Sequence, residues 1–414
     1  MADSVDKTIP SDTENSCFEL LVKEKEEGIK GWLTVLGASL VYLSTFGIIN
    51  SFGFFQELYQ NTYLKTTPAS TISFIGTIQI LLMNLLAAPA GSLFDYYGLK
   101  YLYIFSGIGT SGGLVLLSIS QPTVLWQLFL IQGVLLGLAI AFGAQPALVV
   151  VGHHFFRRRA LVMGIVAAAG SVGGVCFPLI FARLTPMIGF AWSVRLVALV
   201  ILTCYIVALC ISSTKSIQQP LSKLSELLDF RGFLDSRYSV LALGAFVTML
   251  GQFVPYYYIT SYCVAANPSS PAKVFLLPAM NAASIVGRIL GGLAADDTGP
   301  ANIVYPMTLL SGIQCLAMWL VTSDPGVLLA FASLYGFCSG VFIAVLPVIV
   351  AQISPECKLG GRIGAFYSVL AIAQLVGSPI AGALIRDVGD GVGEGRAYMG
   401  LIVFAVSVVD RVIL

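Results

Sequence analysis

Arg288 is the residue whose type and position point most clearly to chemistry. It lies in the run Val274–Leu293, which holds no other charged side chain. A charge inside an apolar, membrane-length segment is costly unless it faces a cavity or a partner. A guanidinium group can hold a carboxylate through two parallel hydrogen bonds. We therefore expect Arg288 to contact an anionic substrate or a gate; the alternative is that its side chain extends toward the near end of the helix.

Uncharged polar side chains form a second group of candidates. Those inside apolar runs are Asn50, Gln79, Asn84, Gln252 and Gln374. Each could face a central cavity or form a hydrogen bond with a neighbouring helix. The residue types alone leave both interpretations open.

A proline followed by three tyrosines interrupts another apolar run. Pro255 precedes Tyr256, Tyr257 and Tyr258. Proline removes a backbone hydrogen bond and kinks a helix. A kinked aromatic cluster could close an outer gate over a substrate, and we expect Tyr256 and Tyr257 to do so. The alternative is an aromatic belt at the membrane interface.

The pattern G-x-x-x-D-x-x-G occurs twice, 201 residues apart. Its residues are Gly91, Asp95 and Gly98, with Lys100 following, and then Gly292, Asp296 and Gly299. Glycine permits tight turns and close helix contacts, and the aspartate can cap or pair across two helices. The repeat predicts two related halves with a conformational role for these loops.

The composition predicts a membrane protein. Of the 414 residues 57% are apolar and only 10% are charged, with a net charge of +1. A soluble enzyme, a disordered chain and a nucleic-acid-binding protein are thereby excluded, since the last would need a basic excess. Residues 1–31 contain no signal peptide and are expected to form a disordered cytosolic tail.

Twelve apolar runs are long enough to cross a membrane, at about 20 residues per crossing. The first six make an N-terminal bundle, 32–211: Trp32–Phe55, Ser73–Leu93, Leu102–Ile119, Val124–Leu148, Ala160–Phe181 and Trp192–Ile211. A polar linker, 212–237, precedes the C-terminal bundle, 238–414: Tyr238–Ala265, Val274–Leu293, Ile303–Val321, Val327–Val350, Gly364–Ile385 and Tyr398–Leu414. The last run is short and charged, and we expect it to be cut off early.

The loops predict the orientation. With a cytosolic N-terminus, fifteen Lys and Arg residues fall on the cytosolic side and five on the outer side. Because positive loops stay inside, both termini are expected in the cytosol. Arg157, Arg158 and Arg159 contribute to this bias, and we interpret them as topology determinants rather than substrate ligands.

The repeated motif resembles the cytosolic loop of the major facilitator superfamily. Further stretches resemble its monocarboxylate-porter branch in the fungal version: Glu27–Trp32, Asn50–Phe55, Phe155–Gly164, Asn281–Arg288 and Gly377–Gly382. The resemblance implies twelve helices in two six-helix halves, which exchange access to a central site. It also favours Asn50 and Gln374 as substrate ligands, because spans 1 and 11 line the cavity in this superfamily.

The chain departs from the animal members of that branch at two places. They carry an acidic residue where this chain has Ser284, and a lysine in span 1 where it has Ile49 and Asn50. Serine does not exchange a proton at physiological pH. We therefore expect facilitated diffusion, or transport in which the substrate's own carboxyl group carries the proton.

The function expected from these features is secondary transport of a small organic solute. By resemblance the solute is a monocarboxylate or a similar organic anion; the alternative is export of a fungal secondary metabolite, and a transporter-like nutrient receptor is a third. No phosphate-binding loop occurs, so ATP is not expected to drive transport, and His153 and His154, interpreted as one loop, offer neither a catalytic set nor a metal site. No enzyme activity or cofactor is expected. The partners expected are a small molecule and the lipid bilayer, in the plasma membrane or the vacuolar membrane.

Overall fold

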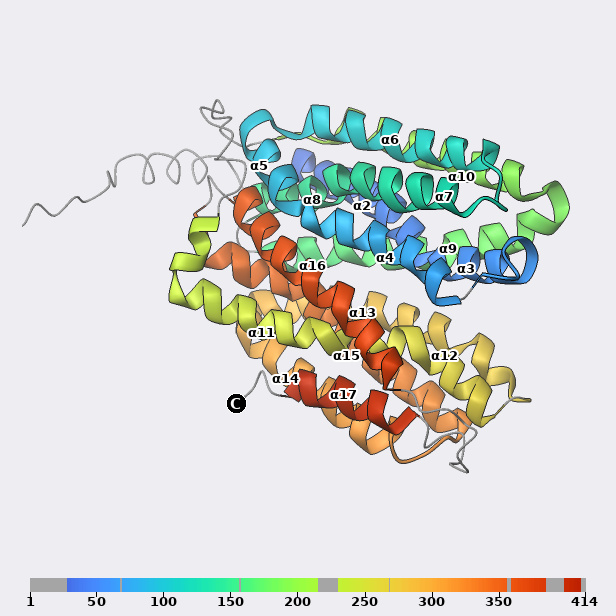
Figure 1. Ribbon diagram of the computed structural model, residues 1–414. Coiled ribbons are helices and arrows are strands. Elements are labelled where there is room, and N and C mark those ends of the chain that lie inside the picture. Colours follow the sequence, from blue (N-terminus) through green and yellow to red (C-terminus); the bar gives the residue numbers. More distant parts are fainter. Residues whose placement is uncertain are drawn as a thin grey trace, which may run out of the picture.

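The structure is a computed structural model that describes residues 28–67, 69–155, 158–214, 230–267, 269–355, 359–384 and 398–410. Every regular element in these ranges is a helix (Figure 1). Ten helical segments are long and apolar enough to cross a membrane, and the bent pair α4 and α5 makes an eleventh among the described residues. These correspond to the first eleven predicted spans. Within the twelfth run the described helix is α17.

The helices of the N-terminal half account for six spans. They are α2 (Ile29–Asn50), α3 (Phe52–Leu58), η1 (Tyr59–Tyr63), α4 (Ala69–Leu85), α5 (Ala87–Tyr97), α6 (Leu99–Ile119), α7 (Leu125–Leu128), η2 (Phe129–Leu135), α8 (Leu136–His154), α9 (Arg159–Ile188) and α10 (Phe190–Ile211).

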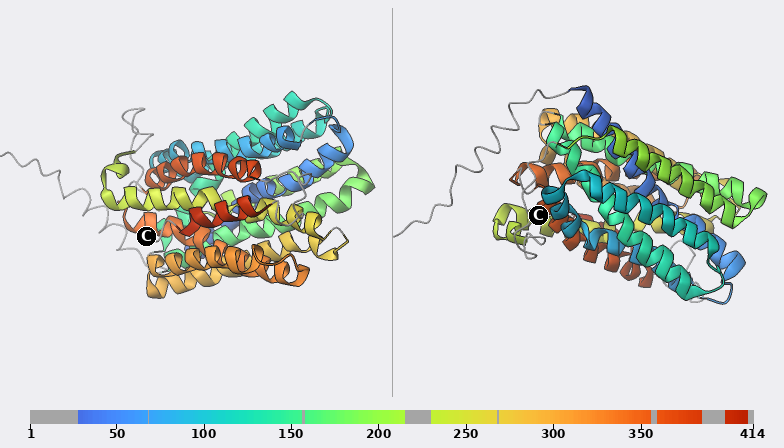
Figure 2. Two further views of the ribbon diagram at one scale, coloured as in Figure 1. Left: turned by 60° about the horizontal axis from the view of Figure 1, so that its bottom comes forward. Right: turned by 90° about the horizontal axis from the view of Figure 1, so that it is seen from above.

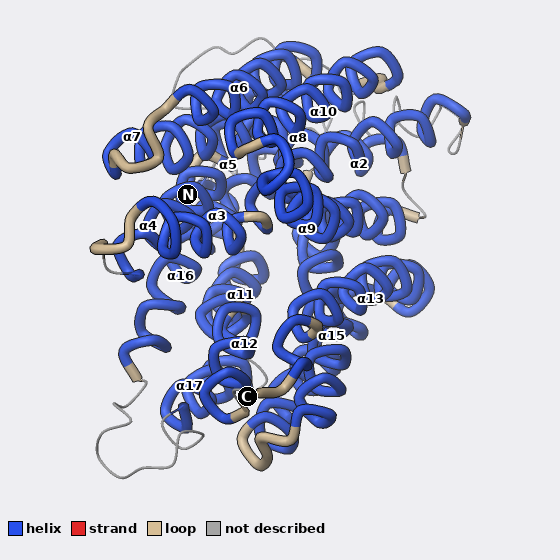
Figure 3. The backbone as a smooth tube through the Cα atoms, turned by 90° about the vertical axis from the view of Figure 1, so that its right-hand side faces the viewer, coloured by secondary structure: helices blue, strands red, loops and turns tan. Residues whose placement is uncertain are grey.

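The C-terminal half repeats this arrangement. Its helices are η4 (Phe230–Leu234), α11 (Ser236–Gln252), α12 (Val254–Ala266), η5 (Pro271–Val274), α13 (Leu276–Thr298), α14 (Pro300–Gln314), η6 (Cys315–Trp319), α15 (Pro325–Gln352), α16 (Leu359–Ala383) and α17 (Met399–Asp410). In both views of Figure 2 the long helices run side by side. Seen along the helices, the N-terminal half and the C-terminal half form two groups, with α16 beside α4 (Figure 3).

Several predicted boundaries were wrong. The fourth span continues through His154, so His153 and His154 lie in the last turn of α8 rather than in a loop. The apolar residues Val149, Val150 and Val151 are fully buried there, and their packing extends the helix past the predicted end. The fifth span, α9, extends to Ile188, past the predicted end at Phe181.

Two spans are broken rather than continuous. The second bends by 40° between α4 and α5. The seventh is interrupted at Phe253, two residues before Pro255, as the proline predicted. The predicted tail up to residue 27 and residues 215–229 of the predicted linker lie outside the described residues.

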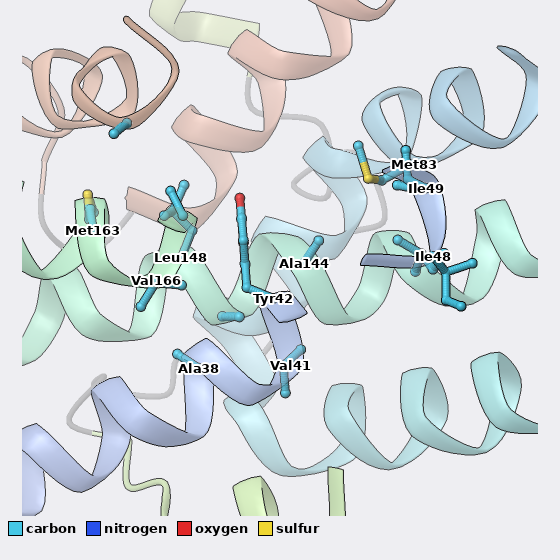
Figure 4. Packing of buried hydrophobic residues seen from close by; sticks show 14 of the residues in the cluster. Ala38, Val41, Tyr42, Ile48, Ile49, Met83, Ala144, Leu148, Met163 and Val166 are labelled. Atoms are coloured by element: carbon cyan, nitrogen blue, oxygen red, sulfur yellow. The ribbon is translucent and has the colours of Figure 1, made fainter. Parts of the chain in front are cut away.

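Apolar side chains fill the interior of each half. Figure 4 shows part of the larger cluster, in which Ala38 and Val41 of α2 pack near Leu148 of α8 and Val166 of α9. A smaller cluster in the C-terminal half includes Trp319, Phe331 and Tyr335. The two halves are therefore packed as bundles around the helices that carry the candidate residues.

The halves meet most extensively at the end of the bundle where Asp95 and Asp296 lie, which we call the motif end. There α5 packs against α16, and α9 packs against α13. Toward the opposite end, which we call the far end, α3, η1 and α12 make their extensive contacts within their own halves. The structure is therefore closed at the motif end.

Candidate functional site

Arg288 is buried at the contact between the two halves. It lies on α13 with 8% of its surface exposed. Its Nη1 donates a hydrogen bond to the backbone oxygen of Ala167 on α9, in the opposite half. Its Nε has no hydrogen-bond partner among the described residues. The side chain is thus not turned to the near end of its helix, and part of its donor capacity is unused.

Three tyrosines surround this arginine. Tyr42 of α2, Tyr256 of α12 and Tyr367 of α16 are close enough to interact with it electrostatically, and no carboxylate among the described residues does so. In Figure 4 the ring of Tyr42 extends away from α2, with its hydroxyl directed toward the ribbon of the C-terminal half. One helix of the N-terminal half, α2, and three of the C-terminal half, α12, α13 and α16, therefore supply a basic and aromatic cluster in which no described carboxylate is a counter-ion. Arg288, Tyr42, Tyr256 and Tyr367 belong to it, and we call it the arginine cluster.

The two tyrosines predicted as a gate lie on different sides of α12. The Tyr256 hydroxyl is 2.9 Å from the Ser339 hydroxyl on α15. Tyr257 is 51% exposed and lies on the side of the helix roughly opposite the buried Ile259 and Tyr262. Tyr256 therefore belongs to the arginine cluster, whereas Tyr257 does not.

Asn50 and Gln374, the other two predicted ligands, are not hydrogen-bonded to Arg288. The Nδ2 of Asn50 donates to the backbone oxygen of Gly170 at 3.4 Å, within the N-terminal half. The Oε1 of Gln374 accepts from Asn84 at 2.7 Å, which joins α16 to α4 across the halves. Gln374 therefore contributes to contact between the halves, and Asn50 to packing of α2 on α9.

The two motif aspartates make equivalent contacts across the halves. Asp95 accepts hydrogen bonds from the backbone N–H groups of Gly360 and Gly361, at 3.1 and 2.8 Å. Asp296 accepts from those of Ala160 and Leu161, both at 2.8 Å. Each carboxylate thus occupies the positive N-terminus of a helix in the other half, α16 or α9. Both contacts hold the motif end closed.

The motif glycines serve turns and close approaches. Gly98 and Gly299 have φ angles of 75° and 95°, which side chains other than glycine rarely adopt. A Cβ at Gly91 would run into the backbone oxygen of Gly360, and one at Gly292 would lie 2.5 Å from that of Ala160. Larger residues at these two positions would separate the halves.

Lys100 lies apart from these contacts. It is exposed at the start of α6 and makes no ion pair with the described residues. The structure therefore gives no contact through which Lys100 would take part in closing the motif end.

Several residues of the site do not stand out in the sequence. Tyr42, Tyr367 and Ser368 were not singled out because tyrosine and serine are common in membrane helices, and the Ala167 contact uses only its backbone. Gly164 of α9 and Gly364 of α16 are 200 residues apart. This spacing could have indicated that α9 and α16, like α5 and α13, are related by the repeat. Among the described residues no group of three His, Cys, Asp or Glu side chains could hold a metal ion.

The sequence profile of the Major Facilitator Superfamily matches residues 34–310 and 241–409. This chain belongs to the major facilitator superfamily. The Agnestins efflux protein AgnL12 of Paecilomyces divaricatus is 32% identical over 373 residues, which cover 90% of this chain and 83% of the relative. The Aspyridones efflux protein apdF of Emericella nidulans is 32% identical over 368 residues, or 87% of this chain and 73% of the relative.

Solved structures share the fold. The human organic anion transporter MFSD10 (TETRAN) superposes with a TM-score of 0.67 at 17% identity, covering 97% of this chain and all of that one. The twelve-helix, two-half architecture and the assignment as a multi-pass membrane transporter of small molecules are thereby confirmed. The relatives named as efflux proteins fit the predicted alternative, export of a fungal secondary metabolite, better than the transport of a monocarboxylate or similar organic anion.

Proposed function

We propose that this protein exports a small organic anion, of the kind that fungi produce as secondary metabolites, and that the anion binds at the arginine cluster. The observation that carries the proposal is the buried guanidinium of Arg288, which has an unpartnered Nε and no carboxylate near it among the described residues. A buried cation without a counter-ion favours an anionic ligand. The efflux relatives support the outward direction.

The tyrosines narrow the class of anion. Tyr42, Tyr256 and Tyr367 lie near enough to the guanidinium to interact with it electrostatically, and aromatic rings pack well against planar groups. We therefore infer that the substrate carries its acidic group on a planar, aromatic or conjugated body. A small aliphatic monocarboxylate, as expected for a member of the monocarboxylate-porter-like branch, would leave this aromatic surface largely uncovered.

Transport follows from alternating access by two rigid halves. We place the protein in the plasma membrane, with the motif end and both termini on the cytosolic side. We take the halves as 32–211 and 238–414, joined by the 212–237 linker. The closed motif end then makes this state outward-facing. Breaking the hydrogen bonds of Asp95 and Asp296 would let the cytosolic ends separate and admit the anion.

The experiment compares 1-naphthoate with 1-naphthamide, which has the same ring system but no charge. Counterflow into proteoliposomes should be faster than into protein-free vesicles for naphthoate and should be unchanged for naphthamide. Yeast cells loaded with naphthoate should lose it faster when they express the protein. Transport of lactate without transport of naphthoate would instead support the aliphatic monocarboxylate, and equal transport of naphthoate and naphthamide would contradict an anion site.

A further inference from the structure

Two pairs of crossing helices close the motif end, α9 with α13 and α5 with α16. The hydrogen bond from Arg288 to Ala167 joins the two helices of the first pair. Ala167 lies one turn from Gly164 along α9, and a Cβ at Gly164 would run into the backbone oxygen of Arg288 itself. Asp296 binds the first turn of the same helix. The candidate substrate ligand is thus also a component of the closed gate.

The other crossing is related to this one by the internal repeat. Residues of α13 and α5 correspond at an offset of 201, and residues of α16 and α9 at an offset of 200. Gly364 packs on the backbone oxygen of Ala87 as Gly164 packs on that of Arg288. At the position equivalent to Arg288 the second crossing therefore has an alanine, so only the first crossing carries an arginine there.

The hydroxyl of Ser368 stabilises the second crossing, that of α5 and α16, instead. The Oγ of Ser368 on α16 accepts from the backbone N–H of Ala88 at 3.2 Å and lies 3.1 and 2.9 Å from the backbone oxygens of Asn84 and Leu85. This short side chain sits between backbone groups of the bend between α4 and α5. The Arg288 side chain, by contrast, is long and has several donors, which a ligand can compete for.

We propose that Arg288 exchanges partners during the transport cycle. Its Nη1 binds the Ala167 oxygen when the motif end is closed, and it binds the substrate anion when that end is open. This inference rests on the proposed function, because it takes the substrate to be an anion. The unpartnered Nε gives the anion a contact that persists while Nη1 changes partner.

This exchange of partners has a thermodynamic consequence for the direction of transport. A hydrogen bond from a charged donor changes an equilibrium constant by roughly tenfold or more. Closure of the motif end therefore weakens anion binding by about this factor and favours release at the far end. By linkage, anion binding shifts the halves toward the state with an open motif end by the same factor.

The experiment measures the distance between spin labels at the motif end by double electron–electron resonance. The labels replace Tyr101 and Asn302, two exposed residues at the starts of α6 and α14 that correspond under the offset of 201. Native cysteines are replaced first. An open motif end gives a longer distance than a closed one, and the protein is measured without ligand and with 1-naphthoate.

Without ligand, Arg288→Ala should raise the long-distance population about tenfold, whereas Arg288→Lys, which keeps one donor for Ala167, should resemble the wild type. Naphthoate should raise the long-distance population of the wild type, whereas Arg288→Lys, which lacks the bidentate fork, should need about tenfold more naphthoate for the same rise. Arg195→Ala is the matched control, because Arg195 binds Ser118 within its own half. It should leave the distances unchanged.

The outcomes separate the two proposals. Unchanged distances in ligand-free Arg288→Ala would overturn the partner exchange, and the anion site would still stand if naphthoate counterflow were lost in that variant. An open motif end in Arg288→Ala together with undiminished naphthoate counterflow would overturn the anion site and leave the contact between the halves. Unchanged wild-type distances on addition of naphthoate would also contradict the exchange.

Discussion

At the scale of single residues, the two motif aspartates each neutralise the N-terminus of a helix in the opposite half. We expect Asp296→Asn to weaken the closed motif end, since the amide carries no charge and offers one acceptor oxygen to two N–H groups. The maximal rate of transport should fall about tenfold, a loss typical of one charge-assisted hydrogen bond, with little change in half-saturating concentration.

The neighbouring Asp297 is the matched control. It is exposed at the same end of α13, so Asp297→Asn removes a charge at nearly the same place and should leave the rate unchanged. Concentration-dependent counterflow in proteoliposomes measures both constants. A large rise in half-saturating concentration at an unchanged maximal rate would place Asp296 in binding rather than in the cycle.

The sequence singles out these aspartates and Arg288 because charges inside or beside apolar runs are conspicuous. It could not predict their partners. Asp95 binds Gly360 and Asp296 binds Ala160 through backbone N–H groups, and Arg288 binds a backbone oxygen. Backbone groups occur at every position, so only the packed structure selects which of them meets a side chain.

At the scale of elements, the bend between α4 and α5 is held by a residue of the other half. We expect Ser368→Ala to leave the Ala88 N–H without its partner and to loosen the crossing of α5 and α16 by about 1 kcal/mol. The long-distance population of the labels at positions 101 and 302 should rise roughly fivefold, since 1.4 kcal/mol is a factor of ten.

Ser333→Ala serves as the control for this change. Ser333 is half-buried on α15, and its hydroxyl bonds only to the Leu329 oxygen of the same helix among the described residues, so its removal should leave the distances as they are. A Ser368→Ala protein with wild-type distances would show that the bend needs no support from α16.

The positions of the spans were predictable from long apolar runs, but their breaks were predictable only where proline marks them. Pro255 predicted the break at Phe253. The bend before Ala87 is likewise followed by a proline, Pro89, and it is also stabilised by Ser368, 280 residues along the chain from Ala88. Contacts between distant segments override local preference, which explains why the boundaries of the second and fourth spans were missed.

At the scale of the whole molecule, the loop charges predict which end faces the cytosol. Lys65 and Thr298 are exposed near opposite ends of the bundle. In intact cells a membrane-impermeant maleimide should label Lys65→Cys, whereas Thr298→Cys should react only after permeabilisation. The reverse pattern would invert the topology and would make the present conformation inward-facing.

The charge distribution also predicts how transport is driven. Because no carboxylate interacts with Arg288 among the described residues, the protein has no acid there that could load a proton with each cycle. An imposed pH gradient should therefore not concentrate 1-naphthalenesulfonate, an anion that stays unprotonated, in proteoliposomes with the membrane potential clamped. Uphill accumulation of this sulfonate would require a proton-carrying group elsewhere in the chain.

The most direct measurement of the central claim is naphthoate counterflow in Arg288 variants at matched protein level in the vesicle membrane. We expect Arg288→Lys to raise the half-saturating concentration about tenfold, because the planar fork is lost, and Arg288→Ala to abolish counterflow. Arg195→Ala, which removes a cation from the N-terminal half alone, should transport normally. Wild-type counterflow in Arg288→Ala would contradict an anion site at this arginine and the export function built on it.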